Sequence, residues 1–248
     1  MKKLLICTLL ISTQVFALTG REVMNKIQAK SQGYLGATSK MVMTLIDAHG
    51  AKVERIMNAE VLENTKTGDK SITAFEKPLD VKGTKLLTWT VKDGANSQWL
   101  FLPKFKRVKK INSRNQAGSF MGSEFSYEDI AGQQIDKYKY KLLKEDAKSW
   151  TVESTPIDKS GYSKMITVIS KDKVNPLSIE YFDRKGELLK VSTLENFKTY
   201  KANKKSFELA NKITMENKQT KKKSVIEWTK RILGVKLKES DFKSTKLK

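Results

Sequence analysis

Few side chains in this sequence could carry out covalent chemistry. His49 is the only histidine, and it lies beside Gly50 in a predicted turn, which favours an exposed turn residue over a catalytic base. A Ser-His-Asp triad would need this histidine, and the chain has no Gly-x-Ser-x-Gly elbow, no His-Glu-x-x-His pair and no phosphate-binding glycine loop. Glu128, Asp129 and Glu153 supply carboxylates, but their spacing singles out no acid–base pair. We therefore predict that the protein is not an enzyme and uses no metal or cofactor.

The N-terminus has the pattern of a secretory signal peptide. Basic residues precede an apolar run at 4–11, and small or apolar residues lead to Ala17, which predicts a signal peptide over 1–17. The run is too short to span a bilayer, which takes about 20 apolar residues. The only cysteine, Cys7, lies too early in the run to be acylated as in a lipoprotein. We predict one periplasmic domain over 18–248, without disulfides, cysteine zinc sites or thiol nucleophiles.

The chain is strongly basic, with a formal net charge of +21. A charge of this size favours anionic partners, among them lipid headgroups, lipopolysaccharide and nucleic acid. Export makes nucleic acid the least suitable of the three, so we predict transient contact with anionic membranes and no nucleic-acid partner. A generally lysine-rich proteome would explain the charge equally well. Nothing in the sequence calls for an oligomer, and we expect a monomer.

Part of this charge is concentrated at 103–114, which carries six positive residues and no acid. The segment is either a docking surface or an exposed edge strand, because lysines on an edge strand also prevent pairing with other sheets. The docking candidates are Lys104, Lys106, Arg107, Lys109, Lys110 and Arg114.

Large and adaptable apolar side chains are frequent in the predicted strands. Methionine and aromatic residues suit a surface that must accept varied apolar shapes, so they are candidates for lining a lipid cavity. The alternative is that they fill the core of a closed β structure, which periodicity cannot distinguish. The strand residues in this set are Met43, Leu45, Met57, Trp89, Trp99, Phe101 and Met165.

A helix followed by many strands should position these residues. Thr19 and Glu22 have the spacing of a capping box, which predicts a helix to about Gln32, with Gly33 at its end. Its apolar residues form one stripe that should dock on the remaining fold. A short helix is also expected near 239–246. Residues alternate with period two in the predicted strands at 38–46, 52–63, 70–77, 84–92, 97–102, 137–145, 148–155, 163–172, 177–183, 187–200, 205–216 and 221–230.

Short turns join most of these strands, which predicts an antiparallel meander of about eleven strands because parallel strands need long crossovers. A sheet of this size curls into a barrel or half-barrel, with the helix in its mouth or concavity. The predicted fold class is therefore mainly β, with one curved antiparallel sheet.

The segment 118–130, Gly-Ser-Phe-Met-Gly-Ser-Glu-Phe-Ser-Tyr-Glu-Asp-Ile, resembles the outer-membrane lipoprotein-sorting protein family related to the LolA carrier. The resemblance extends to 78–84, to 99–103 with the following basic run, and to 241–247, and so covers essentially the whole mature chain. The central string is long and compositionally unusual, while the basic and terminal matches are less specific. Lysine stands where the family often has arginine in the basic run.

The resemblance implies an open antiparallel half-barrel whose concave side is closed by helices over a hydrophobic cavity for acyl chains. It implies a periplasmic carrier of lipoprotein acyl chains or of another envelope lipid, moving cargo toward the outer membrane. In the motif, Phe120, Met121, Phe125 and Tyr127 would complete the set of cavity residues as an apolar plug or lid over its mouth. Glu124, Glu128 and Asp129 would cap a short helix. Asp129 would pair with Arg114 or Lys110. The alternative is that the motif is a well-packed connection.

A second function fits the charge and the strand pattern almost as well. Members of this wider group resemble partners of RND or MMPL-type exporters, so the protein could be an accessory subunit with a filled half-barrel that docks on such a transporter. A third hypothesis is an exported protein that binds anionic polymers.

Overall fold

The computed structural model describes residues 18–92 and 94–248. The predicted signal peptide, 1–17, lies outside the described residues, so the proposed cleavage stays a prediction. No helix in the described part of the chain is long and apolar enough to cross a bilayer.

The N-terminal helix α1 (Gly20–Ser31) forms where the sequence predicts it. The backbone N–H of Thr19 donates to the Glu22 carboxylate at 2.7 Å, and the N–H of Glu22 donates to the Thr19 hydroxyl at 3.2 Å. This reciprocal arrangement is the predicted capping box, which satisfies donors left free at the start of a helix. The chain leaves the helix through Gly33, whose φ of 106° suits glycine.

Thirteen strands form one antiparallel sheet in the order β6-β5-β4-β3-β2-β1-β15-β14-β11-β10-β9-β8-β7. Strands that follow one another in the chain pair as hairpins from β1 to β6 and from β7 to β11. The pairing of β1 with β15 joins the first and last parts of the chain. The strands are β1 (Gly36–Ile46), β2 (Lys52–Leu62), β3 (Lys70–Lys77), β4 (Lys85–Trp89), β5 (Ser97–Leu102), β6 (Arg107–Ile111), β7 (Tyr138–Glu145), β8 (Ser149–Pro156), β9 (Lys164–Ser170), β10 (Pro176–Phe182), β11 (Leu188–Glu195), β14 (Lys212–Asn217) and β15 (Lys223–Leu233).

The prediction of a mainly β, antiparallel, curved sheet is confirmed, although the strand count differs. The expected strands at 187–200 and 205–216 are each divided, because β12 (Lys198–Ala202) and β13 (Lys205–Leu209) leave the main sheet as a separate hairpin. Asn196 has a φ of 53° at the first of these divisions. The basic run contributes the further strand β6.

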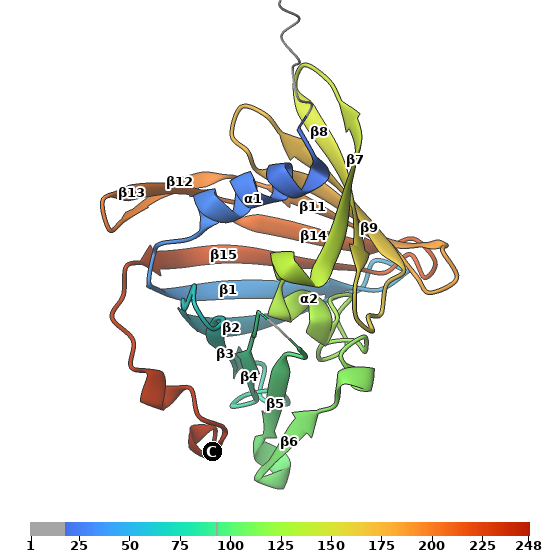
Figure 1. The fold of residues 1–248 in the computed structure, drawn as a ribbon. Coiled ribbons are helices and arrows are strands. Elements are labelled where there is room, and N and C mark those ends of the chain that lie inside the picture. The colour runs from blue at the N-terminus through green and yellow to red at the C-terminus, as the bar shows by residue number, and fades with distance from the viewer. Residues whose placement is uncertain (1–17, 93) are drawn as a thin grey trace, which may run out of the picture.

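Helices are few, as expected. Figure 1 shows α1 lying across the strands in the upper part of the sheet and α2 (Tyr127–Ala131) on the same side, nearer β1 and β15. We call this side of the sheet the inner face. Single 3₁₀ turns occur at Pro103–Phe105, Ser113–Asn115, Ile135–Lys137, Glu239–Asp241 and Ser244–Lys246.

The inner face carries the largest apolar cluster of the described chain. It joins Met41 and Met43 of β1 to Met57 of β2, and to Phe120 and Phe125 of the loop before α2. A second cluster packs Val23 and Met24 of α1 against β8 and β9. One region of the inner face is therefore filled by residues 118–131, that is, α2 and the segment before it, which we call the α2 loop. Another region is covered by α1.

The C-terminal segment differs from the expected helix near 239–246. It forms two 3₁₀ turns, and Phe242 between them and Leu247 after the second pack on Leu87 and Phe101. Leu86 belongs to the inner cluster, and successive side chains of a strand point to opposite faces, so Leu87 and this segment lie on the outer face. Side-chain burial on the sheet, rather than helical hydrogen bonding, holds the segment in place.

Candidate binding cavity

A cavity of about 520 Å³ lies between α1 and the inner face of the sheet. This volume is in the range of pockets that hold small organic ligands. Strands from both halves of the sheet contribute to its walls, together with residues 133–136 and Leu209 of β13. Its apolar lining consists of Met24, Ile27, Ala37, Val61, Ile135, Tyr140, Pro176, Ile179, Leu209, Trp228 and Leu233.

Helix α1 is the roof of this cavity. Met24 and Ile27 lie three residues apart and therefore on one side of the helix, where they line the cavity. Val23, next to them on the same apolar stripe, is fully buried in the cluster with β8 and β9, which fixes the helix on the sheet. Arg21 adds an ion pair with Asp136 and a hydrogen bond of 3.2 Å to the carbonyl of Ile135. These contacts hold the roof to a wall of the cavity.

The cavity also exposes a few polar groups. Arg231 of β15 is half-buried, and burial lowers the pKa of its guanidinium to about 10, which still leaves it cationic at neutral pH. On β9, the hydroxyl of Thr167 is buried without a hydrogen-bond partner, and so is the side-chain N–H₂ of Gln133. Both residues line the cavity. A mostly apolar pocket with a few polar groups suits an amphiphilic ligand.

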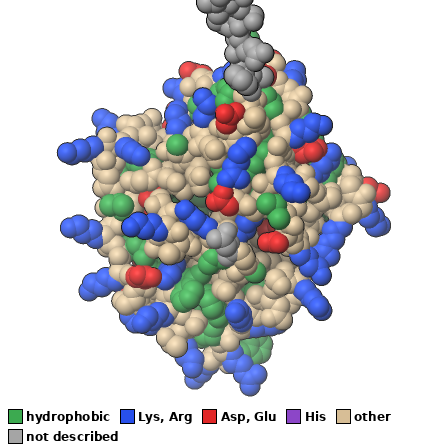
Figure 2. All heavy atoms as spheres, in the orientation of Figure 1, with side chains coloured by type: hydrophobic (Ala, Val, Ile, Leu, Met, Phe, Trp, Pro, Cys, Tyr) green, Lys and Arg blue, Asp and Glu red, His purple; other side chains and the backbone are tan. Residues whose placement is uncertain are grey.

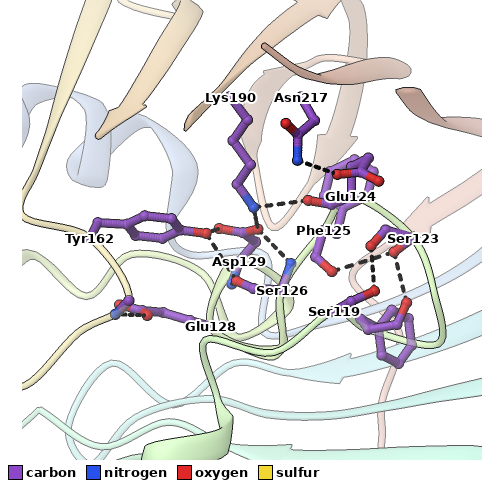
Figure 3. Close-up of polar contacts among 12 residues, drawn as sticks. Ser119, Ser123, Glu124, Phe125, Ser126, Glu128, Asp129, Tyr162, Lys190 and Asn217 are labelled. Carbon is purple, nitrogen blue, oxygen red and sulfur yellow. Dashed lines mark hydrogen bonds and ion pairs between the residues drawn. The ribbon is translucent and has the colours of Figure 1, made fainter. Parts of the chain in front are cut away.

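Beside the cavity, a buried polar network anchors the α2 loop (Figure 3). The Lys190 ammonium on β11 donates to Asp129 at 2.6 Å and to the carbonyl of Glu124 at 2.9 Å. The Tyr162 hydroxyl donates to Asp129 at 2.8 Å, and Asp129 also accepts from the backbone N–H of Ser126. The rings of Tyr162 and Tyr181 each lie 5.3 Å from the Lys190 ammonium.

This network keeps every buried charge hydrogen-bonded, as charges removed from water require. Burial, and next the negative charge of Asp129, raises the pKa of the Tyr162 hydroxyl, so this group remains a donor. Glu124 accepts from Asn217 at 2.8 Å, and Glu128 accepts from the backbone N–H of Gly161 at 2.9 Å. The acidic residues of the motif thus fasten the α2 loop to three separate parts of the chain.

The motif forms the predicted short helix, but Glu124 lies before its N-cap and binds Asn217 instead, and one predicted ion pair differs. Ser126 and Asp129 form a capping box at the start of α2, which agrees with the predicted capping role of Asp129. The predicted pairing of Asp129 with Arg114 or Lys110 is wrong, because Asp129 pairs with Lys190. Arg114 is exposed, and Lys110 lies over the Trp99 ring at 5.6 Å. The Asp129 carboxylate is buried, and its counter-ion Lys190 is buried with it. Arg114 and Lys110 are exposed and do not meet this carboxylate.

None of the eleven residues predicted for the cavity lines it. Eight lie in or against the inner cluster, where the α2 loop fills the concave side: Met43, Leu45, Met57, Phe120, Met121, Phe125, Tyr127 and Met165. Phe120 and Phe125 are buried beside Phe75, which fits an apolar plug and equally a well-packed connection. Their predicted contact with cargo finds no support in the geometry of this cavity.

The other three, Trp89, Trp99 and Phe101, were also predicted to line the cavity, but they lie on the opposite side of the sheet from it. They lie on the outer face under the C-terminal segment, and the Trp89 indole N–H donates to the carbonyl of Phe242 at 2.8 Å. Strand alternation separates the two faces of a strand but does not indicate which of them is concave. The prediction missed four residues that line the cavity. The apolar stripe of the first helix could have indicated Met24 and Ile27, whereas no sequence pattern indicates Arg231 or Thr167.

The six predicted docking residues are exposed, and three of them, Arg107, Lys109 and Lys110, belong to β6, an edge of the sheet. The structure thus places them where both interpretations, a docking surface and a protected edge, require. Figure 2 shows lysine and arginine side chains around the whole outline of the visible face, so the positive charge is not confined to this run.

Comparisons with known proteins identify the fold. A protein-family model described as an uncharacterized protein family matches residues 67–248. No curated protein matches the sequence. A DUF1329 family protein from Desulfovibrio piger has 23% identity and a TM-score of 0.85, covering 92% of this chain and 98% of its own. A LolA superfamily protein from Nitrosomonas europaea has 20% identity and a TM-score of 0.71, with the same two coverages.

A higher identity comes from a crystal structure of a domain from Vibrio parahaemolyticus, assigned to outer membrane lipoprotein sorting. It is 37% identical, has a TM-score of 0.87, and the match covers 92% of this chain and 97% of that chain. The overall fold therefore recurs in a relative of closely similar length. The chain belongs to the outer-membrane lipoprotein-sorting protein family with the LolA-like fold.

Proposed function

We propose that the protein is a periplasmic carrier that holds the acyl chains of a lipoprotein or another envelope lipid during transfer toward the outer membrane. The observation that carries this proposal is the cavity of about 520 Å³ between α1 and the inner face, with its apolar lining. Membership of the lipoprotein-sorting family and the signal peptide pattern support the same role.

The physical need for such a carrier follows from hydrophobic transfer. Burying an acyl chain of about 15 methylenes gains roughly 12 kcal/mol, so free passage through water is negligible. A cavity replaces the bilayer during transit, but it must not bind so tightly that release fails. Only part of the inner face is open, because the α2 loop fills the region of Met41 and Met43. We expect cargo under α1 and not under the α2 loop.

We further propose that the basic run guides the carrier to anionic membrane surfaces. Its six cations are exposed around an edge strand, and Phe105 beside them is 61% exposed. Charge acts over about 8 Å at physiological salt, whereas apolar burial acts only on contact. The basic run therefore determines how fast and in which orientation the carrier meets a membrane, and the cavity determines how tightly the cargo is held.

The filled region of the inner face favours one alternative, an accessory subunit of an RND or MMPL-type exporter. Crosslinking in cells separates the two roles. An accessory subunit traps a transporter loop in stoichiometric amounts, whereas a carrier also traps lipid or lipoprotein.

The carrier proposal is tested by purifying the protein gently from its own host and analysing co-purified lipid by mass spectrometry. We expect about one acylated molecule per protein, and binding of added acyl probes after delipidation. Protein that carries no lipid and ignores phospholipid, lipoprotein and acyl probes would contradict the proposal.

A further inference from the structure

Arg231 is a cation in the wall of a cavity whose exposed surface is mostly apolar. Its guanidinium lies 4.4 Å from the centre of the Trp228 ring and 5.4 Å from that of Tyr200. Nη1 donates to the carbonyl of Ala210 and to the side chain of Asn211, both at 3.1 Å. The two rings and two acceptors fix the planar group at the cavity wall, where cation–π contact and hydrogen bonding reinforce each other.

The charge of Arg231 has no acidic partner in the protein. Among residues 18–92 and 94–248, no carboxylate lies within ion-pair distance of it. Its hydrogen bonds to Ala210 and Asn211 come from Nη1, and its other close contacts are with Tyr200 and the Trp228 ring, so none of its partners is a carboxylate. A half-buried cation without a counter-ion is an energetic cost that an anionic ligand would relieve.

The acids of the cavity are otherwise engaged. Glu63 accepts from the backbone N–H groups of Gly33 and Leu35, both at 2.8 Å. Asp136 pairs with Arg21. Asp69 accepts from the backbone N–H of Asn64 at 2.8 Å. Lys92 adds a further positive charge to the lining.

We propose that Arg231 binds the anionic head of the cargo, so that the cavity selects acyl lipids in which a phosphate or carboxylate lies next to the chain. This inference rests on the proposed carrier function. The fork of a guanidinium matches two oxygens of a phosphate or carboxylate, and Trp228 beside it gives the first methylenes an apolar contact.

The opposite wall gives room for the chain. Arg231 is on β15 and Thr167 on β9, separated by β14, β11 and β10. At about 4.8 Å between neighbouring strands, the two positions are roughly 19 Å apart along the curved sheet. Ile179 and Pro176 lie near the far end of this path and line the cavity. A head at Arg231 therefore directs the chain beneath α1.

The test compares two ligands that differ only in the anionic group, palmitoyl lysophosphatidic acid and monopalmitoylglycerol. Each displaces a neutral fluorescent acyl probe from delipidated full-length mature protein. We expect about tenfold tighter binding of the anionic ligand, in line with one charge-assisted contact. Inorganic phosphate without an acyl chain is expected not to displace either ligand at millimolar concentration. Displacement by phosphate alone would overturn the assignment to a lipid head.

Arg231→Gln should bring the affinity ratio of the two ligands close to one, because it should weaken binding of the anionic ligand by about tenfold more than binding of the neutral one. The matched control is Lys230→Gln, which removes the same charge from an adjacent, exposed position of β15 and should keep the ratio. Arg231→Lys retains charge without the fork and should keep part of the ratio, and it also serves as the test if the glutamine variant fails to fold.

The outcomes separate the inference from the carrier function. Equal binding of both ligands by the unchanged protein, or an equal loss of both in Arg231→Gln, would overturn the role of Arg231 but leave the carrier function standing. Binding of neither ligand would overturn both.

Discussion

Lys190 and Asp129 form a buried ion pair, with 2.6 Å between Nζ and Oδ2 and side-chain exposures of only 5% and 6%. Lys190 lies on a central strand and Asp129 on the α2 loop, so the pair joins the family motif to the sheet. Because the Glu124 carbonyl and two tyrosine rings complete the surroundings of the ammonium, no water is needed to solvate it.

Asp129→Asn should therefore destabilise the protein strongly. The change leaves Lys190 buried without its counter-ion, and removing one partner of such a pair costs about 3–5 kcal/mol. Chemical denaturation gives the free energy of unfolding. The double variant Asp129→Asn with Lys190→Met, which removes both charges, should be more stable than the single variant. A single variant within about 1 kcal/mol of the unchanged protein would show that the pair does not anchor the loop.

Ser39→Trp should block the cavity. Ser39 lines it from β1, whereas its neighbour Thr38 points to the other face of the sheet and is absent from the lining. We expect Ser39→Trp to weaken binding of an acyl probe by about tenfold or more, and Thr38→Trp to change it by less than about twofold. Fluorescence titration of delipidated protein measures both, with circular dichroism to confirm folding. Equal effects of the two variants would place the bound chain elsewhere.

Neutralising the basic run should slow docking without emptying the cavity. We expect the variant with Lys106, Arg107, Lys109 and Lys110 replaced by glutamine to associate with anionic vesicles about fivefold more slowly or worse at low salt, with a flatter salt dependence. Stopped-flow mixing with vesicles containing phosphatidylglycerol measures the rate. Binding of a neutral acyl probe should not change.

In a matched control variant, four lysines on or next to β7, the opposite edge strand, are replaced by glutamine. These exposed residues are Lys139, Lys141, Lys144 and Lys148. If this variant slows docking as much as the first, total charge rather than the basic run sets the encounter rate. Loss of neutral-probe binding in the first variant would mean that the run belongs to the cavity or to the fold.

The turn between β7 and β8 should make stability depend on pH in acid. The Asp146 carboxylate accepts from the backbone N–H groups of Lys148 and Ser149 at 2.9 and 2.8 Å, and also from the Ser149 hydroxyl. The Lys148 N–H and these other donors lower the pKa of Asp146 from 3.8 to about 2. A group whose pKa is lower in the folded state stabilises above its unfolded pKa, and this contribution is lost as pH falls through the folded value.

We therefore expect Asp146→Asn to be less stable than the unchanged protein above about pH 5. The difference should shrink between about pH 4 and pH 2 and then vanish. Thermal unfolding of both proteins across this range measures it. A difference that stays constant down to pH 2 would show that the hydrogen bonds do not depend on the charge of Asp146.

The sequence alone predicted the local features of the fold. The capping box at Thr19 and Glu22, the antiparallel hairpins and the cap at Asp129 depend on residues within a few positions of each other, and local sequence determines them directly. The helical stripe with Met24 and Ile27 was likewise visible, and it proved to roof the cavity. Family membership followed from one long motif.

Only the tertiary structure decided which face each apolar residue covers and which groups meet. Trp99 and Leu100 are adjacent in β5, yet one packs under the C-terminal segment and the other on the inner face. Period-two alternation separates two faces without saying which one is concave. Lys190 meets Asp129 across 61 positions. Arg231 reaches the cavity because the sheet brings β15 beside β1. Such contacts depend on how the sheet curves and which strands become neighbours, and no short stretch of sequence records either.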